Sequence, residues 1–323
     1  MPTATLFNYT FSLTQPNPDA HVPPTIRKLV IVGGGSAGWM AAMMLADALL
    51  PKGIEIEVLE SPVVGIIGVG EGSTPWLRGF FDKLGIEEAE WMPACHATYK
   101  CGITFDKWST KPGFESYFHP FASMLDNLTM TQFVHNVNAR VQGADVHAHP
   151  NRFFIASKLA EQDMAPKPDP NFPFDVWYGY HFDAVLLGQF LQKKALARGV
   201  KYRSCHVKEV KLGENGDIAA VVIDGGEAVP ADFFVDCTGF ASLLTQQTLK
   251  TPFVSFSNNL FNDAAVAMPT PIGDDIPSQT VSTAMRHGWS WKIPLTERFG
   301  NGYVYSSSFC SADEAEQIGR AHV

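Results

Sequence analysis

The stretch KLVIVGGGSAGWMAAMMLADALL, residues 28 to 50, decides the fold. It begins with a short apolar run, passes through consecutive glycines and continues as an apolar segment of helical length. This order predicts a buried strand, a tight turn and a helix. The segment GIEIEVLE, residues 53 to 60, then predicts a second strand. Together these segments predict a βαβ unit at the start of an α/β fold.

The glycines of this turn have the spacing of a dinucleotide-binding fingerprint. The first permits a tight turn, the second lets a pyrophosphate approach the backbone, and the third allows close packing of helix and strand. A glycine-rich turn without a ligand is the alternative, but the flanking strand, the helix and an acidic residue that could accept ribose hydroxyls favour a nucleotide. The residues predicted to bind it are Gly33, Gly35, Ser36, Ala37, Gly38 and Glu60.

Two downstream segments favour FAD over NAD. VDCTG, residues 235 to 239, resembles the second flavin-contact motif of FAD-dependent hydroxylases. HVKEV, residues 206 to 210, falls where those enzymes place a strand beside the adenine. Each is also compatible with an ordinary strand end. In this order they predict that Val207 and Gly239 contact FAD.

A second glycine turn and a lysine follow the βαβ unit. GVGEGSTP, residues 68 to 75, predicts a flexible loop over the flavin with Gly70, Glu71 and Gly72 at its centre, and a plain surface loop is the alternative. Lys100 has Tyr99, Ile103, Phe105 and Trp108 nearby in the sequence. Most lysines are solvated, but aromatic surroundings predict partial burial, a lowered pKa and an amine free for chemistry.

Two aromatic segments complete the set of motifs. SYFHPF, residues 116 to 121, predicts that His119 and Phe121 form one wall of a slot for a flat substrate. GWSWKIP, residues 288 to 294, places two tryptophans on one face of a predicted strand. Ordinary core packing is the alternative for both segments.

Composition excludes several functions. The 323 residues carry a net charge of −9, which argues against binding to nucleic acid. No apolar run is long enough to predict a membrane span. Five scattered cysteines and a start without the features of a secretory signal predict a cytoplasmic protein with reduced thiols.

The predicted architecture is α/β: an FAD-binding, Rossmann-like fold of the flavin monooxygenase type with an interwoven β-rich substrate region. A substrate-facing insert of irregular structure is expected to separate the two parts of the FAD-binding core. The expected segments are a flexible arm (1–26), the first core part (27–108), the insert (109–179), the second core part (180–249), a β region beside substrate and flavin (250–316) and a tail (317–323).

GGGSAGWMAA, GVGEGSTP, ATYKCGITF, VDCTGF and GWSWKIP occur here in that order. With these motifs the chain resembles the flavin-dependent halogenases of the tryptophan halogenase family, from about Arg27 to Glu316. The resemblance implies that Lys100 is catalytic. It also implies that Trp289, Trp291, Ile293 and Pro294 lie beside the flavin and keep the substrate away from it.

The resemblance implies a reaction as well. A separate reductase supplies reduced FAD, and oxygen forms a C4a-hydroperoxide that oxidises chloride or bromide to hypohalous acid. This oxidant passes through an internal tunnel to the lysine, which presents it to an electron-rich aromatic ring. The implied partners are the reductase and a small aromatic substrate, without a metal, and a homodimer is left open.

Some features depart from the family. Its tryptophan-specific members usually have Glu-Ala-Thr-Ile-Pro where this chain has residues 71 to 75, and Asn-Ala-Ser-Tyr-Lys where it has residues 96 to 100. Tryptophan, other indoles and phenols are therefore all open as substrates. The family continues beyond this point with a second catalytic residue, a glutamate, so the chain is expected to be an inactive fragment.

The last residues, IGRAHV, resemble a translated adapter oligonucleotide, with an ordinary polar tail as the alternative. Two other functions stay open for the chain: a flavin-dependent aromatic monooxygenase, and a non-catalytic FAD-binding module.

Overall fold

The computed structural model describes residues 26–65 and 68–322. Apart from Ile26, the predicted N-terminal arm lies outside these residues. Among the described residues, no helix is both long and apolar enough to span a lipid bilayer.

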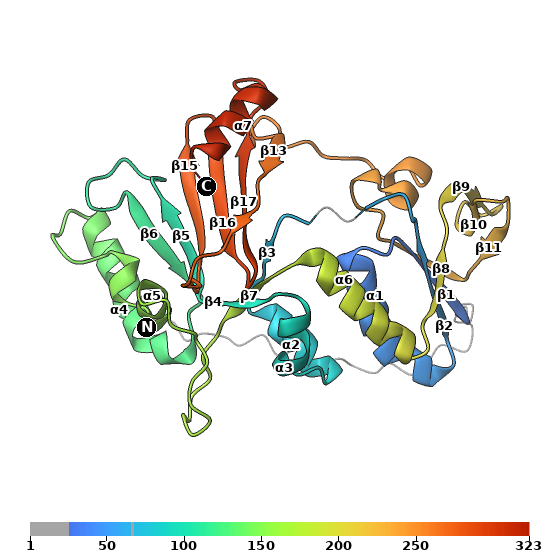
Figure 1. Cartoon of the computed structure of the whole chain (residues 1–323), viewed down its shortest axis with the longest axis horizontal. Helices are drawn as coiled ribbons and strands as arrows, with labels where there is room; N and C mark the ends of the chain where they lie inside the picture. Colours follow the sequence, from blue (N-terminus) through green and yellow to red (C-terminus); the bar gives the residue numbers. More distant parts are fainter. Residues whose placement is uncertain (1–25, 66–67, 323) are drawn as a thin grey trace.

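The predicted βαβ unit is confirmed. Strand β1 (Lys28–Val32) leads into helix α1 (Ser36–Leu49) and strand β2 (Glu55–Glu60). With β8 (Lys201–Ser204) and β12 (Phe233–Asp236) these strands form a parallel sheet in the order β12-β1-β2-β8. The order brings the end of the VDCTG segment beside the glycine turn, although about 200 residues separate them in the sequence. Figure 1 shows β1, β2 and β8 of this sheet side by side.

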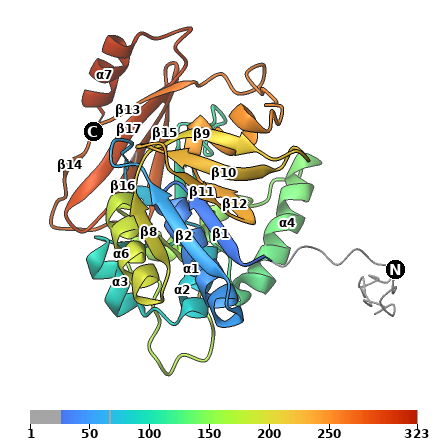
Figure 2. The same cartoon turned by 90° about the vertical axis from the view of Figure 1, so that its right-hand side faces the viewer.

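Side-chain alternation along β1 gives the parallel sheet two buried faces. Leu29 and Ile31 pack with helices α1 and α6 (Ala184–Ala197) in one core cluster. Val30 and Val32 pack with an antiparallel sheet on the opposite face. Figure 2 shows this second sheet against the first. Its strands are β9 (Val207–Leu212), β10 (Ile218–Ile223) and β11 (Ala228–Pro230).

A seven-stranded sheet is woven from distant parts of the chain. Strand β5 pairs in parallel with β15, so residues near 103 lie beside residues near 280. This confirms the interwoven β-rich region. Its strands are β5 (Gly102–Asp106), β6 (Ser116–Pro120), β13 (Ala264–Ala267), β14 (Thr270–Pro271), β15 (Thr280–Met285), β16 (Gly288–Pro294) and β17 (Arg298–Tyr305).

A small antiparallel sheet joins the two halves of the fold. It has the order β3-β7-β4, from β3 (Glu71–Gly72), β7 (Gly179–Phe182) and β4 (Thr98–Lys100). Strand β7 runs directly into α6, and β4 runs directly into β5. Helices α2 (Trp76–Leu84) and α3 (Glu88–Ala94) pack beside it. The remaining short turns of helix are Leu50–Lys52, Met124–Asp126, Pro150–Arg152, Gly239–Ala241 and Leu243–Thr248.

The expectation of irregular structure over residues 109–179 is wrong. This region contains β6, helix α4 (Asn127–Val141) and helix α5 (Ile155–Glu161). Before α4, Ser123 and Asp126 form a reciprocal capping box, a start signal that the Pro, Phe and His content obscured. At the other end of the chain, α7 (Ala312–Arg320) crosses the predicted boundary at residue 316 without a break.

Gly302 is needed for the packing of the tryptophan strand. It faces Trp291 across the β16–β17 ladder, and a Cβ there would lie 2.0 Å from the indole ring. We therefore expect Gly302→Ala to displace Trp291 and lower the free energy of unfolding by about 1–3 kcal/mol. Urea unfolding followed by tryptophan fluorescence measures this.

The matched control is Gly79→Ala in α2, where an added Cβ meets no atom within 4 Å. This variant should unfold at the wild-type urea concentration or slightly above it, since alanine favours a helix. Equal stability of the two variants would show that Trp291 tolerates the methyl group.

Candidate functional site

The glycine turn after β1 is built by close backbone contacts. Gly33 has φ +111°, and a Cβ there would lie 2.1 Å from the carbonyl oxygen of Cys237. A Cβ on Gly38 would lie 1.9 Å from the Gly33 oxygen. Neither position can hold a side chain without moving the backbone, so the turn, β12 and α1 fit together only with glycine there.

Gly35, which lies between Gly33 and Gly38, has open space around it instead. A Cβ on Gly35 would meet nothing within 4 Å. Gly35 is the N-cap of α1, and neither a capping side chain nor an acidic residue covers the first turn of this 14-residue helix. The turn therefore offers free N–H groups and open space at the positive end of a helix, as a pyrophosphate requires.

The carboxyl ends of β1, β2 and β12 gather the other predicted FAD contacts. Glu60 closes β2 and lies against Gly34, where a Cβ would be 2.4 Å from its carboxyl carbon. Burial raises the pKa of Glu60. Gly239 follows β12 with φ +62° and open space around its Cα. Val207 opens β9, which the His206–Ser61 contact of 3.0 Å ties to the end of β2. These residues fit an FAD site at a strand-end crevice.

The second glycine turn is anchored at its central carboxylate. The two oxygens of Glu71 accept hydrogen bonds from the backbone N–H groups of Val69, at 3.1 Å, and Ala184, at 3.0 Å. Burial raises the pKa of Glu71, and these two bonds oppose the effect. Ser36 in α1 donates to the Ala184 oxygen at 3.0 Å. The second glycine turn is therefore joined to the start of α6. Through α6 it is joined to the glycine turn after β1, residues 33 to 38, which we call the nucleotide turn.

The same turn contacts two other motifs. A Cβ on Gly70 would lie 3.0 Å from the Gly300 Cα and 3.7 Å from the Ile293 side chain, so this residue packs on the tryptophan strand. A Cβ on Gly72 would lie 2.8 Å from the Lys100 amine. Consecutive parts of one turn thus connect the nucleotide turn, β16 and the lysine.

Lys100 is buried without a counterion. It is 5% exposed, and burial lowers the pKa of its amine to about 8. Among the described residues no ion pair or hydrogen bond offsets this effect. The Phe121 ring lies 5.6 Å from the amine. The predicted burial and lowered pKa of Lys100 agree with the structure.

Three of the four predicted neighbours of Lys100 make their contacts elsewhere. Tyr99 is on the other face of β4, where its hydroxyl donates to Glu88 together with those of Tyr178 and Tyr180. Phe105 and Trp108 pack against each other further along the chain. The error arose because a strand alternates its faces at every residue, so sequence neighbours are not spatial neighbours. Ile103, the other predicted neighbour, pairs through its backbone with Thr280.

A fully buried histidine lies beside the lysine instead. His181 contacts the hydroxyl of Thr98 through Nδ1, at 3.0 Å, and the hydroxyl of Thr280 through Nε2, at 2.9 Å. Burial, and then the charge of Lys100, hold the pKa of His181 well below its usual value. His181 is not among the site residues predicted from the motifs, because its segment, HFDAVLLGQF, has the apolar spacing of a helix. Asp183, which caps α6, is the signal that would have excluded it from that helix.

An aromatic cavity of about 500 Å³ lies next to Phe121. Arg78 is held within it by an ion pair to Asp175 at 2.9 Å and stacks on Tyr178. His119 is exposed on β6 and does not line this cavity, so its substrate role stays a prediction. The lining residues are Thr74, Pro75, Trp76, Arg78, Gly79, Asp82, Pro120, Phe121, Ala122, Asp175, Trp177 and Tyr178.

The two tryptophans lie on β16 as the period of two predicts. Their ring centroids are 6.2 Å apart, Trp291 is buried, and Trp289 is half-buried. Ile293 and Trp291 share a small core cluster with Val69 of the second glycine turn. The carbonyl of Pro294 accepts a 2.7 Å hydrogen bond from the Thr98 hydroxyl. The strand therefore reaches the surroundings of Lys100 at its end.

The comparisons with known proteins agree with this geometry. A family model described as tryptophan halogenase matches residues 28–323. The chain belongs to the tryptophan halogenase family. The resemblance inferred from its motifs is thereby confirmed.

Individual members of the tryptophan halogenase family match most of this chain. The tryptophan 6-halogenase of Streptomyces toxytricini is 38% identical over 323 aligned residues, covering 92% of this chain and 60% of that protein. The tryptophan 7-halogenase of Kutzneria sp. (strain 744) is 38% identical, with coverages of 90% and 58%. A flavin-dependent halogenase structure from Xanthomonas campestris superposes with a TM-score of 0.81 at 35% identity, covering 92% and 59%. The chain thus spans about 60% of the length of these relatives.

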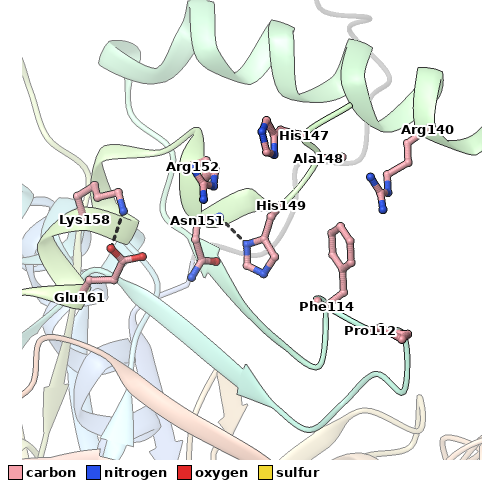
Figure 3. A pocket seen from close by; sticks show the side chains of 11 residues that line it. Pro112, Phe114, Arg140, His147, Ala148, His149, Asn151, Arg152, Lys158 and Glu161 are labelled. Carbon is pink, nitrogen blue, oxygen red and sulfur yellow. Dashed lines mark hydrogen bonds and ion pairs between the residues drawn. The ribbon is translucent and has the colours of Figure 1, made fainter. Parts of the chain in front are cut away.

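The chain has a second, larger cavity, which none of the predicted site residues lines. It measures about 850 Å³ and lies between the end of α4, α5 and the turn before α5 (Figure 3). Its lining residues are Pro112, Gly113, Phe114, Arg140, His147, Ala148, His149, Asn151, Arg152, Lys158 and Glu161.

Most of the cations in this larger cavity are matched locally. Arg140 donates to the Val146 oxygen at 2.9 Å and lies over Phe114, and Lys158 pairs with Glu161 at 2.6 Å. The basic lining therefore does not by itself indicate an anion site.

The burial of Lys100 has a measurable consequence for stability. Because the pKa is about 8 in the folded state and 10.5 unperturbed, the unfolded chain binds the proton more tightly between these values. Stability contributed by this group therefore increases as the pH rises from 8 to 10.5. We expect Lys100→Met to raise the free energy of unfolding at pH 7 by about 2–3 kcal/mol, with the gain declining over that range.

Urea unfolding at pH 7, 9 and 10.5 measures this gain. Lys211→Met, at an exposed lysine of β9, is the control and should show no comparable dependence on pH. A constant difference between Lys100→Met and wild type across the range would mean that Lys100 titrates normally.

Proposed function

We propose that the chain takes part in halogenating an electron-rich aromatic ring, with reduced FAD, O₂ and chloride or bromide as reactants and Lys100 as the catalytic residue. The observation that carries the proposal is the buried amine of Lys100, which has no counterion within the described chain and touches the glycine turn tied to the nucleotide turn. The names of the relatives, tryptophan 6-halogenase and tryptophan 7-halogenase, support the same reaction class.

The nucleotide turn is proposed to hold the cofactor. The first-turn N–H groups of α1, from Ser36 and Ala37 onward, bind the pyrophosphate, while Gly35 leaves space for it. Glu60 accepts the ribose hydroxyls, and Val207 and Gly239 flank the bound molecule. When bound, reduced FAD would supply two electrons and two protons, which with O₂, a halide ion and one further proton give hypohalous acid, water and oxidised FAD.

Lys100 is proposed to act on the hypohalous acid. In its ammonium form it donates a hydrogen bond to the oxygen, which polarises the oxygen–halogen bond. The ring attacks the halogen, the new carbon–halogen bond forms as the oxygen–halogen bond breaks, and the oxygen leaves as water with the proton that the ring carbon loses. A buried site with little access for water protects the oxidant from side reactions.

The aromatic substrate is proposed to bind on the side of Phe121. This ring contacts the amine of Lys100 and also lines the aromatic cavity, so a flat ring there would be close to the lysine. Tryptophan, other indoles and phenols fit this chemistry. Trp289 and Trp291 are proposed to separate this substrate from the flavin, with Ile293 and Pro294 fixing the end of their strand.

The remaining partners follow from the reaction. A separate reductase supplies reduced FAD, since the glycine fingerprint assigned here accounts for a single dinucleotide. The five cysteines are all free thiols in the structure, which supports a cytoplasmic location.

The role of Lys100 is tested by Lys100→Met and Lys100→Arg. With reduced FAD, O₂, bromide and tryptophan or phenol, both variants should lose at least about a hundredfold in halogenated product, because methionine has no hydrogen-bond donor and the larger, planar guanidinium of arginine places its donors at other positions. Mass spectrometry of the product is the measurement. A hydroxylated product that forms without halide would favour the monooxygenase, and halogenation by Lys100→Met would remove the lysine from the mechanism.

The cofactor site is tested by Gly35→Val. Because a Cβ at this position meets no protein atom, the variant should fold normally yet bind FAD at least about tenfold more weakly, its side chain occupying the pyrophosphate space. Flavin fluorescence titration measures the affinity. Gly273→Val, where an added Cβ also meets no atom within 4 Å, is the control for a surface glycine. Unchanged affinity in Gly35→Val would locate the flavin elsewhere.

A further inference from the structure

The hydrogen bonds around His181 have only one arrangement of protons. Thr98 has a single hydroxyl hydrogen, and it donates this to the Pro294 carbonyl at 2.7 Å. At its 3.0 Å contact with His181, the Thr98 oxygen can then only accept. The Nδ1 atom of His181 must therefore carry a hydrogen.

The other ring nitrogen is fixed by the same reasoning. His181 is 0% exposed, and both its burial and the neighbouring charge of Lys100 oppose a second proton on the ring. A neutral imidazole with hydrogen on Nδ1 has a bare Nε2, which accepts the Thr280 hydroxyl hydrogen at 2.9 Å. Donation therefore runs in one direction, from Thr280 through His181 and Thr98 to the end of the tryptophan strand.

This direction leaves the Thr280 oxygen as an acceptor beside the lysine. A Cβ on Gly72 would lie 2.8 Å from the Lys100 amine, 3.4 Å from the Thr280 oxygen and 3.5 Å from the His181 ring. The three groups, from β4, β15 and β7, therefore surround one point.

We propose that Thr98, His181 and Thr280 are positioning residues for Lys100: their one-way hydrogen-bond chain keeps the histidine neutral and presents only oxygen lone pairs to the lysine amine. The ammonium form of Lys100 is thereby more stable than it would be with a hydroxyl hydrogen or an imidazolium facing it. The inference rests on the proposed role of Lys100 for its functional meaning, but the proton arrangement does not depend on turnover.

Few other groups that face Lys100 can influence the charge of its amine. Gly72 and Gly179 contribute backbone, Phe121 contributes a ring, and Glu71 turns its carboxylate to the N–H groups of Val69 and Ala184. Among the described groups with a shifted pKa, His181 is held below its usual pKa partly by the charge of Lys100.

The test begins with the tautomer of His181 in the full chain. Imidazole ¹⁵N chemical shifts, assigned by the signal lost in His181→Gln, should show hydrogen on Nδ1 and a bare Nε2 from pH 6 to 9. Hydrogen on Nε2 in the wild-type protein would overturn the proposal without any further variant.

The matched pair Thr98→Val and Thr98→Ser tests the link to Lys100. Valine keeps the shape but removes the acceptor, so the His181 hydrogen should move to Nε2 and turn the Thr280 hydroxyl hydrogen toward the lysine. The titration midpoint of the Lys100 amine, followed by ¹⁵N NMR and assigned with Lys100→Arg, should then fall by about one pH unit. Thr98→Ser should keep both the tautomer and the midpoint of the wild type.

A midpoint in Thr98→Val equal to that in Thr98→Ser would overturn the proposal, whether or not the tautomer changes. If Thr98→Val does not fold, Thr280→Val and Thr280→Ser replace the pair, and only the valine variant should lower the midpoint. None of these measurements uses halogenation, so continued halogenation by Lys100→Met would contradict the proposed function while leaving the proton arrangement standing.

Discussion

The backbone pairing of β4 with β7 is the constraint on which the site depends. This ladder places Thr98 opposite His181 and Lys100 opposite Gly179. Strand β7 continues into α6, whose first residue is bonded to both α1 and the second glycine turn. Strand β4 continues into β5 and hence into the seven-stranded sheet. The pairing of β4 with β7 therefore sets how the parallel sheet with its helices meets the seven-stranded sheet. A slip of one residue in this pairing would turn Lys100 to the opposite face.

The two faces of β4 have opposite electrostatic character. Behind the strand, Glu88 collects hydrogen bonds from three tyrosine hydroxyls and from Lys167; burial alone would raise its pKa, but these bonds lower it. In front, Lys100 has no such partners, and its pKa falls. The carboxylate is thus stabilised in its charged form while the amine one residue from Tyr99 is not. The hydrogen-bonded cluster around Glu88 fixes β4. The Lys100 amine is therefore held in place without hydrogen bonds of its own.

How much the sequence could predict depended on the range of the interactions. The βαβ unit and its glycines were predictable because a tight turn and close helix packing leave a local pattern, and the burial of Lys100 was predictable from its apolar segment. The partners of the lysine were not, because His181 and Thr280 reach it through pairings between distant strands. Helix α4 was missed because it buries none of its residues completely and so has little apolar periodicity. His119 and Phe121, two residues apart, separated because the strand ends at Pro120 between them.

Strand alternation at Tyr99-Lys100-Cys101 also determines which side chains an oxidant at the Lys100 amine would meet. Thiols and thioethers are the side chains that electrophilic oxidants attack first. Cys101 follows the lysine directly, yet its sulfur is buried with Phe118, Ala156 and Ala160 in a separate cluster. The groups beside the amine are glycine backbone, the Thr280 hydroxyl, a phenyl ring and an imidazole whose lone pair is already engaged. A reactive halogen species held there would meet neither a thiol nor a thioether among these groups.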